Sequence, residues 1–145
     1  MLRSAVFSFL GFPGWGPVHL VVPQQGAPAA TAALLERARR QATAAGAPAS
    51  ALLTHLLRQE RRADPLVAPQ SCELADYRYL VVHRLGGRWA LRITAWRRCG
   101  EPPTWERRWG PMDLDRFIER FRPLHGYASA IGAATGPKAS EILKP

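Results

Sequence analysis

Short apolar runs alternate with turn-forming residues over the first part of the chain. Residues 5–10 (AVFSFL) and 18–22 (VHLVV) have the length and the β-branched or aromatic composition of strands. The stretch 11–17 between them (GFPGWGP) is typical of a rigid turn. Charged residues are absent from 4–35, but proline and glycine keep every apolar run shorter than the ~20 residues of a membrane-spanning helix. We therefore interpret residues 1–28 as a Pro/Gly/Trp-rich N-terminal arm with short strands.

Helical spacing of apolar residues follows the arm. It predicts helices over 29–45 and 49–62, and the short link at 46–48 makes them an αα-hairpin. A later helix is predicted over 112–122, with Asp113 as its N-cap.

A β-hairpin is the clearest local signal. Strands 77–85 and 88–98 flank Gly86-Gly87, a pair that suits a two-residue turn. That turn places Tyr77 opposite Trp96, whereas a slip of one residue exchanges the two faces of the hairpin. A further strand is expected near 104–109, with Trp105, Arg107 and Trp109 on one side.

Together these elements predict an α+β fold. A length of 145 residues suits one domain, so we expect a single domain over 1–145. Its small antiparallel sheet would contain the hairpin 77–98 and the strand near 104–109, with the N-terminal strands as potential further members. The αα-hairpin and the later helix would pack on this sheet. Residues 73–122 thus hold the hairpin, third strand and helix, and 123–145 form an extended C-terminal tail.

The charge of the chain favours an anionic partner. Lys and Arg number 20 against 11 Asp and Glu, for a net charge of +9. Such a surplus suits nucleic acid or an acidic protein surface. Residues 77–98 hold six arginines and no carboxylate, and the αα-hairpin carries a second basic strip. The strip comprises Arg37, Arg40, Arg58, Arg61 and Arg62.

One face of the predicted hairpin combines aromatic rings with arginines. Its members are Tyr77, Tyr79, His83, Arg88, Arg92, Trp96 and Arg98. Rings on a sheet surface stack on bases while guanidinium groups hold phosphates. The same residue types dominate protein–protein hot spots, so an acidic protein is an equal candidate. The alternative is that a helix covers this face and buries its rings.

Signals for chemistry are weak. Cys72, His83, Cys99 and His125 lack the close pairs of a zinc site, and no cofactor motif is present, so we expect neither metal nor cofactor. Thiol chemistry at Cys72 or Cys99 is the one enzymatic option that the sequence leaves open. Two cysteines are too few for a disulfide framework, which favours free thiols in a reducing compartment, the cytoplasm or an organelle interior.

The resulting hypothesis is a non-catalytic basic interaction module. It would act as an accessory or adaptor subunit of a larger assembly, a ribonucleoprotein or an organellar complex, and would bind an anionic partner surface. The alternative is a free single-stranded nucleic-acid-binding protein, such as one from a mobile element, that uses the aromatic and arginine-rich hairpin face.

Overall fold

The computed structural model describes residues 4–23, 26–60, 63–66, 68, 75–84 and 91–122. Its strands are β1 (Ala5–Leu10), β2 (Val18–Val22), β3 (Asp64–Leu66), β4 (Tyr77–His83), β5 (Leu91–Cys99) and β6 (Thr104–Asp113). Its helices are α1 (Pro28–Ala44), the 3₁₀ turn η1 (Ala49–Ala51), α2 (Leu52–Gln59) and α3 (Leu114–Phe121). The α+β class predicted from the sequence is confirmed. The predicted tail lies outside the described residues.

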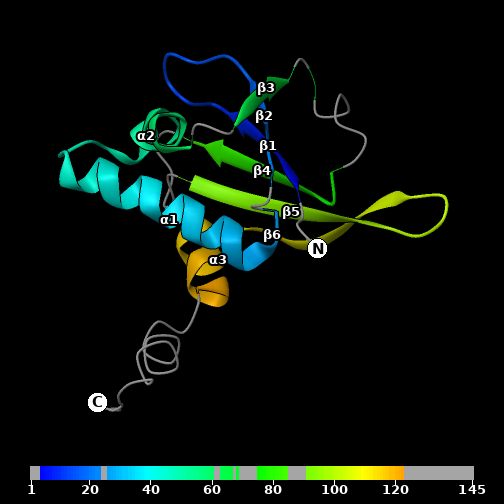
Figure 1. The fold of residues 1–145 in the computed structure, drawn as a ribbon. Coiled ribbons are helices and arrows are strands. Elements are labelled where there is room, and N and C mark those ends of the chain that lie inside the picture. Colours follow the sequence, from blue (N-terminus) through cyan, green and yellow to red (C-terminus); the bar gives the residue numbers. More distant parts are fainter. Residues whose placement is uncertain are drawn as a thin grey trace, which may run out of the picture.

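All six strands form one sheet in the order β3-β2-β1-β4-β5-β6 (Figure 1). The sheet is therefore larger than expected. It is also mixed, because β1 and β4 run parallel while the other neighbours are antiparallel.

The N-terminal strands are inner strands of this sheet. β1 lies between β2 and β4, and β2 lies between β1 and β3. The interpretation of this segment as an arm is corrected accordingly: its strands are hydrogen-bonded on both sides. The proline-punctuated connector after α2 supplies β3, where Pro65 is tolerated because the strand is at the edge.

One face of the sheet carries the core. Alternate residues of β1 (Ala5, Phe7 and Phe9) join one buried cluster with residues of all three helices, including Leu35, Leu56 and Phe117. The helices therefore lie on the same side of the sheet (Figure 1). We call this side the helix-covered face and the opposite side the helix-free face.

Helix boundaries agree with the predicted αα-hairpin within a few residues. Pro28 opens α1, and Gly46 follows its end with a φ of 72° that suits glycine. The second predicted helix begins as η1 and continues as α2 to Gln59. Asp113 is the N-cap residue of α3, as predicted, although its side chain makes no capping hydrogen bond.

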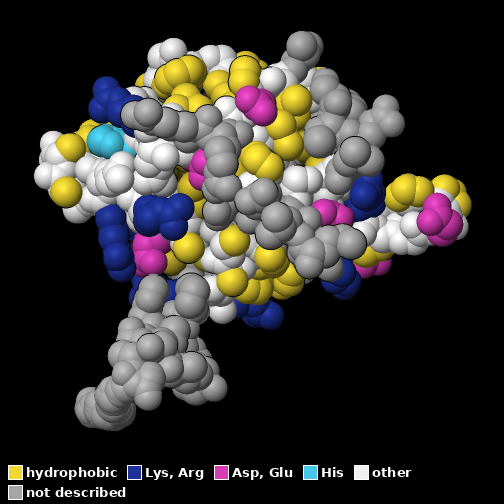
Figure 2. Space-filling model, viewed as in Figure 1, with side chains coloured by type: hydrophobic (Ala, Val, Ile, Leu, Met, Phe, Trp, Pro, Cys, Tyr) yellow, Lys and Arg dark blue, Asp and Glu magenta, His cyan; other side chains and the backbone are white. Residues whose placement is uncertain are grey.

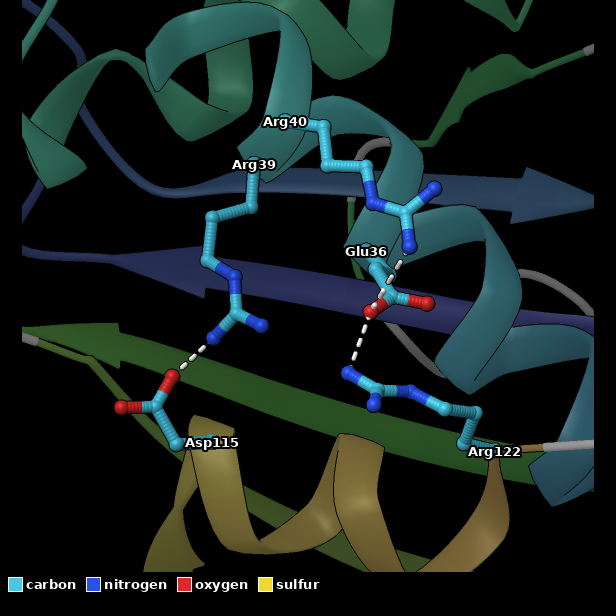
Figure 3. A network of polar contacts seen from close by, with 5 residues as sticks. All are labelled: Glu36, Arg39, Arg40, Asp115 and Arg122. Atoms are coloured by element: carbon cyan, nitrogen blue, oxygen red, sulfur yellow. Dashed lines mark hydrogen bonds and ion pairs between the residues drawn. The ribbon is translucent and has the colours of Figure 1, made fainter.

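An ion-pair network fastens α3 to α1 (Figure 3). The buried carboxylate of Glu36 accepts from Arg122 at 2.5 Å and lies 3.6 Å from the Arg40 guanidinium. Arg39 donates to Asp115 at the start of α3. Burial lowers the pKa of Arg39, an effect that nearby Glu36 opposes. Both helices are thus held at two points in addition to their apolar contact.

Candidate binding face

The register of the β4–β5 pair differs by one residue from the prediction. Tyr77 pairs with Arg97 rather than with Trp96, and His83 pairs with Leu91. The alternating residues of β4 therefore lie on the faces opposite to those that the two-residue turn at Gly86-Gly87 predicted, whereas the alternating residues of β5 lie as predicted. Those two glycines lie outside the described residues.

Tyr77, Tyr79 and His83 consequently lie on the helix-covered face. Their exposed fractions are 6%, 1% and 7%. The Tyr79 ring stacks on Phe7 with 5.1 Å between centroids, and its hydroxyl donates to the Gly26 carbonyl at 2.6 Å. Burial raises the pKa of Tyr79 well above its ordinary value. The prediction that these three share a face with Trp96 is wrong: all three are buried, and Tyr77 and Tyr79 belong to the core cluster.

Arg92, Trp96 and Arg98 lie on the helix-free face. Arg92 and Trp96 pair with Val82 and Arg78, which alternate with the buried residues of β4. Arg98 pairs with Trp105 of β6. The structure thus brings together three of the seven predicted site residues; the remaining one, Arg88, lies outside the described residues.

Three further residues of this face were missed as candidates from the sequence. Arg78 is directly opposite Trp96, and Arg107 of β6 is opposite Trp96 on its other side. Trp105 is next to Arg98. Neighbouring residues Ala95 and Trp96 of β5 pair with Trp109 and Arg107, so that Arg108 is an extra residue in β6. This irregularity separates Trp105 and Arg107 from Trp109, which instead packs against Phe121 on the helix-covered face. The expected common side for all three residues of β6 is therefore corrected.

A hollow of about 300 Å³ opens on the helix-free face. Leu10 and Leu80 supply apolar surface, while Trp96 and Trp105 contribute two aromatic rings. Arg78 lies with its guanidinium carbon 4.2 Å from the centroid of the Trp105 ring, within the range of a cation–π contact. The described residues that line it are Ser8, Leu10, His19, Arg78, Tyr79, Leu80, Trp96 and Trp105. We call it the aromatic hollow.

A second hollow of about 390 Å³ shares Leu80 and Trp96 with the first. Three arginines line it, Arg84, Arg92 and Arg107. Arg92 donates to the Pro111 carbonyl at 3.1 Å, which directs its guanidinium toward β6. The other lining residues are Leu80, Val82, Thr94, Trp96 and Pro111. We call it the arginine hollow.

The described lining of both hollows contains no carboxylate. Carboxylates occur toward the margins of the face: Asp76 is 3.9 Å from Arg98, Asp64 lies on the far edge strand, and Asp113 is opposite Arg92. Positive charge is therefore concentrated at the hollows, over β4, β5 and β6.

A Ser–His pair forms the polar wall of the aromatic hollow. Ser8 and His19 are cross-strand partners, and the Ser8 Oγ is 2.8 Å from the His19 Nδ1. Nucleophilic catalysis with such a pair needs a third group that orients the base. Within the described part of the chain, the His19 ring has its hydrogen bond to Ser8 and no such third group. The pair offers hydrogen-bonding groups to a ligand in the hollow.

The second basic strip is placed in part. Arg37 and Arg58 are exposed on α1 and α2, Arg40 faces Glu36, and Arg61 and Arg62 lie outside the described residues. Figure 2, which views the helix-covered side, shows basic side chains over α1 and α2 interspersed with acidic ones.

The structure describes few of the residues that could support thiol chemistry or metal binding. Cys99 is a half-buried free thiol whose Sγ lies 3.9 Å from Glu106, and Cys72 and His125 are outside the described residues. The described residues contain no cluster of three or more potential metal ligands. Of the helices in the described ranges, none has the length and apolar character to cross a membrane.

Comparisons of the chain with models of known families, with curated proteins and with solved structures give no match. The site must therefore be interpreted from its own geometry.

Proposed function

We propose that this protein is a non-catalytic binding module that holds an anionic partner on its helix-free face. One observation carries the proposal: two tryptophans and a group of arginines line adjoining hollows on a sheet face that no described helix covers. Arginine suits this role because its planar fork binds phosphate or carboxylate in a bidentate manner and also stacks on rings.

Membership of a larger assembly is part of this proposal. The helix-free face combines half-buried apolar residues, such as Leu80 and Val82, with aromatic rings and arginines. Tryptophan and arginine are enriched where binding energy concentrates in protein interfaces. The support for an accessory or adaptor subunit thus comes from this face. The N-terminal segment gives no such support, because its strands are part of the sheet.

Binding of a polyanion by variants with equal net charge tests the proposal. The test variant is Arg92→Gln/Arg107→Gln on the helix-free face, and the control is Arg37→Gln/Arg58→Gln on the helices. Each loses two positive charges. We expect the test variant to elute from immobilised heparin at a clearly lower salt concentration than the control. Equal elution of the two variants would mean that only bulk charge acts and would refute the proposal.

A further inference from the structure

The two hollows adjoin across a shared wall, and their chemistry is complementary. The aromatic hollow offers Trp96, Trp105 and the Ser8–His19 pair, whereas the arginine hollow offers Arg84, Arg92 and Arg107. A nucleotide unit has the same division, with a planar base that carries hydrogen-bonding edges and a phosphate that carries the charge. We propose that the helix-free face binds single-stranded nucleic acid, with a base in the aromatic hollow and backbone phosphate in the arginine hollow. This inference rests on the proposed function and names its ligand.

Stacking geometry supports a base in the aromatic hollow. The Arg78 guanidinium lies over the Trp105 ring, and cross-strand pairing places Arg78 next to Trp96. Three planar groups are therefore arranged around one hollow. Its volume of about 300 Å³ is at the lower end of the ~300–1,000 Å³ common for ligand pockets.

The position of the arginines favours a strand over an acidic protein. Arg92 and Arg107 lie on neighbouring strands, and Arg107 is directly opposite Trp96, which lines both hollows. A chain that places a base beside Trp96 therefore has its phosphate next to Arg107. Single-strand binders combine such aromatic platforms with a basic groove. The Asp and Glu side chains of an acidic peptide supply the charge but not the ring, whereas every nucleotide of a strand carries both.

Fluorescence anisotropy with a labelled 12-nucleotide oligo(dT) tests the inference. We expect Trp105→Leu to weaken binding roughly 5- to 150-fold, the range for loss of one stacked base. Trp15→Leu is the matched control, since Trp15 is 42% exposed in the turn between β1 and β2. Arg92→Gln/Arg107→Gln should reduce the slope of log affinity against log salt by about 1.4, because each contact with a single strand contributes ~0.7.

The outcomes separate this inference from the proposed function. Equal affinity of wild-type protein, Trp105→Leu and Trp15→Leu for oligo(dT) would overturn it, as would equal affinity for oligo(dT) and a duplex of the same length. Absence of oligo(dT) binding, together with the expected difference between the two arginine variants on heparin, would overturn the inference and leave the proposed function in place with an acidic protein as the ligand. Elution of the two arginine variants from heparin at the same salt concentration would refute both the inference and the proposed function.

Discussion

The register of the sheet buries Tyr79, and this burial predicts how the substitution Tyr79→Phe changes the stability of the protein. Replacing Tyr79 by Phe removes only the hydroxyl, which donates to the Gly26 carbonyl at 2.6 Å. Thr31 Oγ1 lies 3.4 Å from the same carbonyl, so this acceptor keeps a partner in the variant. The free energy of unfolding at pH 7 should therefore fall by about 1 kcal/mol, the net worth of an ordinary hydrogen bond.

At high pH the stability difference between the two proteins should disappear. Burial raises the pKa of Tyr79 from its ordinary value of 10.0, so the folded protein keeps a proton that the unfolded chain releases. Stability of the wild type then falls as the pH rises above 10. At pH 11 the loss from this one group amounts to about 1.4 kcal/mol, and Tyr79→Phe does not experience it. The two proteins should have nearly equal stability at that pH.

Urea unfolding followed by tryptophan fluorescence at pH 7, 10 and 11 measures this difference. Every other titrating group is common to the two proteins, so their difference isolates Tyr79. A difference that stays constant from pH 7 to pH 11 would refute the burial of Tyr79. It would also refute the assignment of the helix-covered face that follows from the register.

Two further predictions concern stability and use matched pairs. Gly110→Ala should cost roughly 3 kcal/mol or more, because Gly110 has a φ of 87° and an added Cβ would lie 2.3 Å from the Ile93 carbonyl oxygen. Gly14→Ala should cost only about 1 kcal/mol, since its φ is similar but the space is open. Glu36→Ala should cost about 1–3 kcal/mol because its buried carboxylate joins α1 to α3, whereas Asp115→Ala, at a side chain 83% exposed, should cost less than about 1 kcal/mol. Chemical denaturation measures the loss in free energy of unfolding for each variant. Equal losses for the two variants of a pair would contradict the packing described.

Local patterns were sufficient to predict most elements of this fold. The short apolar run 5–10 and the helical spacing in 29–45 correspond to β1 and α1. The parallel pairing of β1 with β4 was not predicted, because it joins Ala5 to Tyr77 across about half of the chain and leaves no local signal. The sheet was therefore expected to be smaller than it is.

The candidate site shows where periodicity is ambiguous. In 77–83 (YRYLVVH) both alternating sets contain apolar or aromatic residues, so the pattern does not say which set is buried. The decision comes from β1: Phe7 and Phe9 are core residues, and Phe7 is the register partner of Tyr79. This contact buries the tyrosines and leaves Arg78 and Trp96 on the helix-free face. Arg78, alternating with two aromatic residues, was the available sequence signal for the observed register.

The indole N–H resonances of the tryptophans test the binding face most directly. Trp96 and Trp105 line the aromatic hollow, whereas Trp109 packs against Phe121 on the helix-covered face. During titration of labelled protein with the 12-nucleotide oligo(dT), we expect the Trp96 and Trp105 signals to shift together with one dissociation constant while the Trp109 signal stays fixed. Shifts at Trp109 with unchanged Trp96 and Trp105 signals would contradict the assignment of the helix-free face as the binding surface.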